Sequence, residues 1–339
     1  MGKKVSMILW AILIAMSIVL PSQALAQQKV IELTYGTAFA ADHTFSKADA
    51  LWIAKIEKET QSRVKIKPYW GGQVIGGANA VEELAGGVAD IAYVSPNNTK
   101  TGFAIAKAIQ LFFAGASEPM AMRVYQQLRV KFPEIDKEYT DAGIKPLEYS
   151  VNTQEILSAK PIRKLDDLKG KRIRVVGDWA KVLRAVGSEG ITTSTSEMYT
   201  GMQKGILDGI LGLTEGLESL KLADVVKYVS MYDMLAAPFS GRAMNLAKWN
   251  SLPPDIQKVF MSNVEYWSKV TEDGLAAACN QAVEYAKKRG LEVINPSDKA
   301  QLAAIMVSLA DKDAKELDTK GIRGTAILQE AQRLIKGGK

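Results

Sequence analysis

Short runs of β-branched and aromatic residues alternate with longer amphipathic segments along most of this chain. The strand-like runs are residues 31–39, 64–70, 90–95, 144–151, 172–176, 210–213, 243–246 and 291–294. Strands that alternate with helices favour α/β domains built on largely parallel sheets. The length of 339 residues exceeds what one hydrophobic core usually supports, so we expect two such domains.

Residues 46–61 carry the clearest helical period. Their apolar side chains, with the residue just before them, recur at helical spacing and predict the buried face: Phe45, Ala48, Leu51, Trp52 and Ile56. Charged side chains fall elsewhere around the helix and predict the exposed face: Lys47, Asp49, Lys55, Glu57 and Lys58.

Residues 254–289 predict an unusually long helix. Pro253 and Pro254 suit a first helical turn, and Gly290 suits a C-terminal stop. A helix of about 36 residues would be about 54 Å long, longer than one domain, and could therefore be shared between two domains. The alternative is a pair of helices broken at the interior Gly274.

The N-terminus has the features of an export signal. Lys3 and Lys4 precede an uncharged apolar run at residues 7–20, and residues 24–26 (ALA) form a small-x-small cleavage site. The apolar run is shorter than the roughly 20 residues that span a bilayer, although an uncleaved anchor is an alternative. We expect residues 1–26 to be removed and the mature chain to reside in the periplasm.

Composition excludes several classes of function. Removal of residues 1–26 takes two lysines and no acidic residue, so the net charge falls from +6 to +4, and no basic run with interleaved aromatics suggests nucleic acid. Cys279 is the only cysteine, so no internal disulfide can form; it lies in an Ala-rich helical run and is expected to be buried. The chain has one histidine, no HExxH pattern and no GxSxG elbow, so we expect neither an enzyme nor a cofactor, with an exported hydrolase as the main alternative.

Arg174 is the strongest candidate for a binding residue. It alternates into a strand-like run otherwise rich in Ile and Val, in a chain whose ligand would lie at the carboxyl ends of strands. A guanidinium offers a rigid, permanently charged fork of donors that matches a carboxylate. A surface arginine on an edge strand is the competing interpretation.

Other candidates follow the first strands. His43 stands in a loop where it could line a cleft or simply begin the next helix. The glycine cluster at residues 71–77 lacks both the Walker A and GxGxxG patterns and predicts a strand-to-helix turn near a cleft. Trp70 and Trp179 are better placed to line the cleft than Trp52, Trp249 and Trp267, whose helical positions predict core packing; these five side chains make up the tryptophans of the mature chain.

Four motifs resemble the DctP-type substrate-binding proteins of TRAP transporters. Residues 165–175 (LDDLKGKRIRV) and 197–209 (EMYTGMQKGILDG) are similar to two family signatures. Residues 86–92 (GGVADIA) and 245–257 (NLAKWNSLPPDIQ) are similar to two more, in the family's order.

The resemblance implies a two-domain periplasmic binding protein of α/β class, with a ligand cleft between the domains and one long helix shared by both. It implies domain I at residues 27–150 and 240–278, and domain II at residues 151–239 and 279–339. The arginine at position 174 would bind the carboxylate of a small organic acid, and a monomeric protein would deliver that acid to a TRAP membrane permease. A binding protein that serves a sensor is the alternative.

Three departures from the family pattern bear on the ligand. No asparagine follows Asp208-Gly209, no second basic residue stands at Asn152 or Thr153, and the acidic residue often found early in the helix after the glycine turn is replaced near Asn79. A buried hydroxyl without a partner costs roughly 1–3 kcal/mol, so we expect a monocarboxylate with an apolar or aromatic body. We expect the rest of the cleft to be lined by the following residues: Phe39, His43, Trp70, Asn152, Trp179, Leu211, Leu213 and Asn245.

Overall fold

The computed structural model describes residues 29–77, 79–96, 99, 101–177, 179–193 and 195–338. The predicted signal peptide, residues 1–26, therefore lies outside the described residues. Among the described residues, no helix is both long and apolar enough to cross a membrane. The strands are β1 (Ile31–Gly36), β2 (Val64–Tyr69), β3 (Ile91–Tyr93), β4 (Ile144–Ser158), β5 (Arg172–Val175), β6 (Glu189–Thr192), β7 (Gly209–Gly212), β8 (Tyr228–Asn245) and β9 (Glu292–Ile294).

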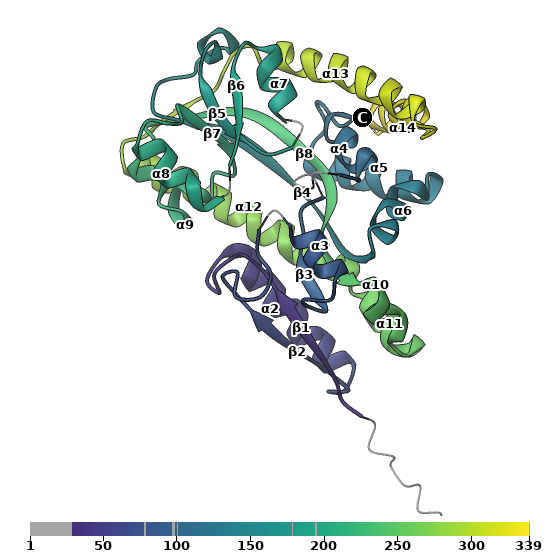
Figure 1. Cartoon of the computed structure of the whole chain (residues 1–339). Helices are drawn as coiled ribbons and strands as arrows, with labels where there is room; N and C mark the ends of the chain where they lie inside the picture. The colour runs from purple at the N-terminus through teal and green to yellow at the C-terminus, as the bar shows by residue number, and fades with distance from the viewer. Residues whose placement is uncertain are drawn as a thin grey trace, which may run out of the picture.

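Helices lie between almost all of these strands (Figure 1). They are α2 (Thr44–Glu59), α3 (Ala80–Ala85), α4 (Ala104–Ala108), α5 (Glu118–Lys131), α6 (Glu134–Asp141), α7 (Trp179–Ala185), α8 (Met198–Gln203), α9 (Gly216–Ser219), α10 (Leu246–Ser251), α11 (Pro254–Ser262), α12 (Val264–Lys288), α13 (Lys299–Thr319) and α14 (Gly324–Gly337). The predicted α/β class is confirmed.

The strands form one sheet in the order β2-β1-β3-β8-β4-β7-β5-β6, with β9 beside β8. β1 pairs in parallel with β2 and β3, and β5 pairs in parallel with β6 and β7. β4 and β8 pair antiparallel with each other and with the strands next to them, β7 and β3. The sheet is thus parallel in each half, as predicted, but antiparallel at its centre.

β4 and β8 are long enough to serve both halves of the sheet. They contain 15 and 18 residues, whereas the sequence predicted only residues 144–151 and 243–246 as strands. Irregular register between Pro146 and Ile156 bends the pair as it crosses from one half to the other. The same two strands thus connect a first domain, with β1, β2, β3, α2 and α3, to a second domain, with β5, β6, β7, α7, α8 and α9.

The predicted long helix is divided, but not at Gly274. The first part is α11, and α12 then runs for 25 residues without a break through Gly274. The break falls at Asn263, whose backbone N–H donates to the Phe260 carbonyl, while its side chain donates to the Val259 carbonyl and to Glu59. At about 38 Å, α12 still contacts α2 of the first domain and α9 of the second.

The helical period of α2 gives most of its buried face correctly. Phe45, Trp52 and Ile56 are buried, as predicted. Two residues differ: Leu51 is 54% exposed, and Asp49 is completely buried. Asp49 is buried because α12 and β8 supply partners for its carboxylate, which no local pattern reveals.

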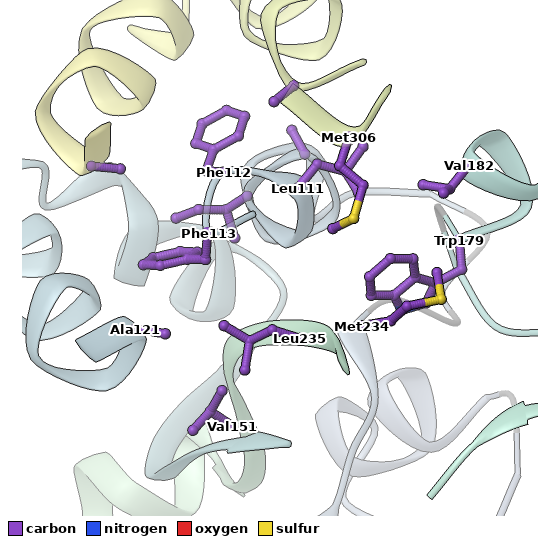
Figure 2. Close-up of a cluster of buried hydrophobic side chains, with 14 of the residues drawn as sticks. Leu111, Phe112, Phe113, Ala121, Val151, Trp179, Val182, Met234, Leu235 and Met306 are labelled. Atoms are coloured by element: carbon purple, nitrogen blue, oxygen red, sulfur yellow. The ribbon is translucent and has the colours of Figure 1, made fainter. Parts of the chain in front are cut away.

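The largest hydrophobic cluster joins segments from distant parts of the chain. Figure 2 shows Trp179 from α7 close to Met234 of β8, with Met306 of α13 and Leu111 nearby. The helices α13 and α14 pack on each other, and α14 also packs on α5 (Figure 1). This packing anchors the C-terminal segment to the body of the protein.

Candidate ligand-binding site

The carboxyl ends of the two parallel strand sets point toward each other along the long strands. Tyr93, at the end of β3, pairs with Arg242, which pairs in turn with Glu148 of β4. Gly212, at the end of β7, pairs with Glu155 of β4. The six residues of β4 between these points, 149–154, therefore lie where loops from both domains converge, as expected for a ligand site in an α/β protein.

Arg174 points its guanidinium toward the end of β6. Its Nε and Nη2 atoms donate to the Thr193 carbonyl at 3.2 and 3.0 Å, and it forms no ion pair with any described residue. The side chain is only 5% exposed. Burial lowers the pKa of Arg174 to about 10, because the cation is desolvated.

Neighbouring Arg172 has a different role. Its Nε atom donates to the Asp208 carboxylate at 3.0 Å, and its Nη2 atom donates to the Gly205 carbonyl at 2.7 Å. Asp208 also accepts from the Arg172 backbone N–H. Arg172 and Asp208 thus join β5 to the turn before β7, and Arg174 is the arginine of this strand that remains available to a ligand.

An aromatic cluster follows β1 and β3 in the first domain. Phe39 stacks on His43 with ring centres 4.3 Å apart, and Tyr93 meets the Phe39 ring edge-on at 5.0 Å. Phe45 lies beneath, 5.0 Å from Phe39 and 5.6 Å from Tyr93. Phe39 and Tyr93 are only half-buried, so they offer apolar surface to a bound molecule.

The Tyr93 hydroxyl remains a free donor within the described part of the chain. No hydrogen bond to a described residue satisfies it, and burial raises the pKa of Tyr93 to about 12. The sequence did not predict Tyr93 or Phe45 as residues of the ligand site, and it placed Phe45 only on a buried helix face. The signal available was weak, because Tyr93 lies inside the predicted strand at residues 90–95, whereas β3 ends at Tyr93.

His43 is both a helix cap and an interdomain contact. Its Nδ1 atom accepts from the Phe45 backbone N–H at 3.2 Å, which caps α2. Its Nε2 atom lies 3.3 Å from Oε1 of Glu215, in the loop after β7. The predicted helix-entry position is thus confirmed, and both ring nitrogens are engaged with protein atoms.

The glycine turn after β2 holds the Phe39 loop in place. Gly71 and Gly72 have φ of +67° and +76°, and their N–H groups donate to the carbonyls of Phe39 and Thr37 at 2.7 and 2.8 Å. A Cβ on Gly76 would lie 2.8 Å from the Gly72 Cα. Because these two N–H groups bind the loop after β1, the glycine turn positions Phe39 and with it the aromatic cluster. The turn follows β2 and precedes α3, as predicted.

Arg242 is a second buried arginine, which sequence analysis missed. It is completely buried, with Nη2 3.0 Å from Asp49 and Nη1 3.4 Å from Glu148. Its guanidinium also lies 4.9 Å from the Phe45 ring centre and 5.3 Å from that of Tyr93. Arg242 thus supports the aromatic cluster from below and is already neutralised by two carboxylates.

A cavity of about 280 Å³ separates the middle of β4 from α12. Two predicted site residues, Asn152 and Leu213, line it, together with Cys279 and the carboxylates of Glu118, Glu155 and Asp233. Arg174 does not line this cavity. Cys279 is only partly buried, contrary to the expected core packing. The burial it does have raises the pKa of its thiol.

The structure places four predicted residues away from the converging loops or in packing roles. Trp179 and Leu211 are completely buried in the largest hydrophobic cluster, where Figure 2 shows Trp179. Trp70 meets the Tyr35 ring edge-on at 5.7 Å, against the first-domain core. Asn245 caps α10 by accepting from Lys248 N–H and donates to the Leu84 and Ala85 carbonyls.

The expected core tryptophans behave as predicted. Trp52, Trp249 and Trp267 are all buried, and Trp52 stacks on Trp267 with ring centres 3.7 Å apart. Within the described ranges, no group of three or more His, Cys, Asp and Glu side chains is arranged to hold a metal ion. Among the described residues, the converging loops thus bring together the buried cation of Arg174, the aromatic rings of Phe39 and Tyr93, and the polar side chains that line the cavity beside β4.

Comparison with known proteins identifies the family to which this sequence is similar. Residues 35–316 match the family model described as bacterial extracellular solute-binding protein, family 7. An uncharacterised protein of Salmonella typhimurium, YiiZ, is 26% identical over 286 residues, covering 79% of this chain and 86% of the relative.

Two solved structures share the fold. A TRAP solute-binding protein from Rhodoferax ferrireducens, in complex with copurified benzoate, matches with a TM-score of 0.80 at 21% identity, covering 91% of this chain and 98% of that one. A TRAP periplasmic solute-binding protein from Chromohalobacter salexigens, with bound D-glucuronate, matches with a TM-score of 0.79 at 16% identity, covering 89% and 99%. The chain therefore belongs to family 7 of the bacterial extracellular solute-binding proteins, the DctP-type proteins of TRAP transporters, which bind solutes for transport and are not enzymes.

Proposed function

We propose that this protein captures a monocarboxylate with an apolar or aromatic body in the periplasm and delivers it to a TRAP membrane permease. Arg174 binds the carboxylate, and Phe39 and Tyr93 contact the body of the ligand. The protein acts as a monomer of two domains, divided as the family resemblance implies. The observation that carries the proposal is the buried guanidinium of Arg174, which has no carboxylate partner in the described chain.

The two buried arginines differ in whether carboxylates of the protein balance their charge. Arg242 is enclosed by Asp49 and Glu148 at 3.0 and 3.4 Å, so its charge is balanced within the protein. Among the described residues, Arg174 donates only to the Thr193 carbonyl, and a neutral acceptor does not balance a buried charge. A ligand carboxylate would supply the missing charge through paired charge-assisted hydrogen bonds.

The surroundings favour one carboxylate over two. Glu118 and Asp233 line the cavity beside Asn152, so a second ligand carboxylate there would meet charges of its own sign. After Asp208-Gly209, where the family pattern has an asparagine, this chain has Ile210 and Leu211, and both side chains are completely buried. The half-buried rings of Phe39 and Tyr93 instead offer surface that suits an apolar body.

Ligand class is tested by calorimetry on the mature wild-type protein with a panel of acids. The panel contains benzoate, mandelate, branched 2-oxo acids, C4 dicarboxylates and hexuronates. We expect micromolar or tighter binding of at least one aromatic or branched monocarboxylate, with hexuronates and dicarboxylates at least about 100-fold weaker. Selective binding of a dicarboxylate or a sugar acid would contradict the proposed ligand class without affecting the family assignment.

A further inference from the structure

One buried contact joins the loop after β1 to the loop after β7. Nε2 of His43 and Oε1 of Glu215 are 3.3 Å apart, and the two side chains are only 9% and 6% exposed. His43 belongs to the first domain and Glu215 to the second. The strands β4 and β8 and the helix α12 run through both domains and connect them permanently. The contact between His43 and Glu215, in contrast, has to form each time the domains approach.

The hydrogen bonds of His43 define how the contact works. Its Nδ1 accepts from the Phe45 backbone N–H, so Nε2 carries the ring proton and donates to Glu215. Burial opposes the ionisation of Glu215, but the hydrogen bonds from His43 and Ser219 outweigh it and lower the pKa of Glu215. The contact is therefore a directed donor-to-carboxylate bond, and it leaves neither ring nitrogen for a ligand.

Each partner is fixed within its own domain. The His43 ring stacks on Phe39, whose carbonyl is held by the Gly71 N–H. On the other side, the hydroxyl of Thr214 donates to the Cys279 carbonyl on α12 at 3.1 Å, which fixes the residue next to Glu215. Formation of the contact thus sets the position of the Phe39 ring relative to the second domain, where Arg174 lies.

We propose that His43 and Glu215 form a latch between the domains that holds the aromatic surface of Phe39 and Tyr93 against the Arg174 side of the cleft. The latch acts as a positioning device: it touches Phe39 and does not itself bind the carboxylate. This inference rests on the proposed function for its effect on ligand retention, whereas its effect on domain arrangement does not depend on any ligand. Loss of the latch lowers the population of the domain arrangement in which His43 contacts Glu215, and so lowers the apparent affinity for ligand.

Two substitutions remove the latch while preserving local structure. His43→Asn keeps a side chain that caps helices well but is too short to reach Glu215. Glu215→Ala removes the acceptor, and Glu215→Gln retains a carbonyl that can accept the Nε2 proton. Glu218→Ala, at an exposed position of α9, is the matched control.

The arrangement of the two domains is measured without ligand, as the distance between two spin labels in double electron–electron resonance spectroscopy. The labels are attached at Val88→Cys and Ile206→Cys, which are 51% and 55% exposed in the first and second domains, in a Cys279→Ser background. We expect His43→Asn and Glu215→Ala to shift the distance distribution in the same way, the double variant to add nothing, and Glu218→Ala to match the parent. Unchanged distributions in folded His43→Asn and Glu215→Ala would overturn the latch.

Ligand retention is measured by stopped flow with the tightest acid of the panel. We expect His43→Asn and Glu215→Ala to accelerate dissociation about tenfold with little change in association, and Glu215→Gln to recover most of the loss. Equal dissociation rates in all variants would contradict the proposed role in retention. If no acid binds the wild type, the proposed function fails, and the label distances still decide whether the latch exists.

Discussion

The guanidinium of Arg242 on β8 and the carboxylate of Asp49 on α2 are 3.0 Å apart, and neither side chain is exposed to solvent. The same carboxylate accepts from the indole N–H of Trp267 on α12 at 2.9 Å, and from the hydroxyl of Tyr35 on β1. Four elements thus meet at one buried carboxylate. This cluster is the structural counterpart of Arg174, because its charges are balanced inside the protein.

Replacement of Arg242 by Met should destabilise the protein severely. The substitution leaves Asp49 and Glu148 buried without their cation, and loss of one partner of a buried pair costs about 3–5 kcal/mol. Urea unfolding of the two proteins measures the difference. Lys269→Ala, which removes an exposed i,i+4 pair with Asp273, should change the free energy of unfolding by less than about 0.5 kcal/mol. An effect of Arg242→Met as small as this control would contradict the structural role.

Gly76→Ala should disturb the Phe39 loop, whereas Gly77→Ala should not. A Cβ at Gly76 would lie 2.8 Å from the Gly72 Cα and 3.1 Å from the Ala38 Cα, so the turn has to move. Nothing lies within 4 Å of a Cβ at Gly77. We expect a loss of about 1–3 kcal/mol in unfolding free energy for Gly76→Ala, with weaker ligand binding. Equal melting temperatures and affinities for the two variants would show that the turn does not position the loop.

Glu155 should make the protein less stable in mild alkali. Burial, together with the nearby charge of Asp233, raises the pKa of Glu155 to about 8. The folded protein then retains a proton that the unfolded chain releases near pH 4, so stability falls as the pH rises toward and through about 8. Glu155→Gln should flatten this dependence between pH 5 and 8 and stabilise the protein at pH 8 by about 1 kcal/mol or more. Parallel pH profiles for both proteins would refute the assignment.

Export should remove residues 1–26. Mass spectrometry of the protein recovered from a periplasmic fraction should give the mass of a chain that begins at Gln27. Replacement of Ala26 by a bulky residue should leave the precursor uncleaved, because the cleavage site needs small side chains. A periplasmic protein that retains its N-terminal residues would indicate an uncleaved anchor instead.

The sequence predicts the elements whose signals are local. α2 and the short strands β1, β2 and β5 follow from periodicity and β-propensity. The length of β8 does not, because residues 228–242 include Pro238 and the charged side chains of Asp233 and Arg242, which read as loop or surface. Pairing with β4 over most of its length compensates for this poor local signal.

In the candidate site, too, residues with a local sequence signal can be predicted, and residues that depend on distant contacts cannot. Arg174 can be identified because a charged residue in an apolar strand is conspicuous and belongs to a recognisable motif. Asp49 cannot, because a carboxylate among Lys47 and Lys55 on a helix reads as solvated, and its burial depends on Arg242, nearly 200 residues away. Trp179 illustrates the opposite failure: its position after β5 suggests a cleft, but contacts with β8 and α13 place it in the core (Figure 2).

Ligand affinity of Arg174 variants tests the central claim most directly. Calorimetry with the tightest acid of the panel compares wild type, Arg174→Ala, Arg174→Lys and Arg184→Ala, the last at an exposed position of α7. Removal of the cation should weaken binding by two to four decades, corresponding to about 3–5 kcal/mol. The lysine variant should recover only part of this loss, because an ammonium lacks the paired donors of a guanidinium, and Arg184→Ala should bind like wild type. Binding by Arg174→Ala within threefold of wild type would contradict the account.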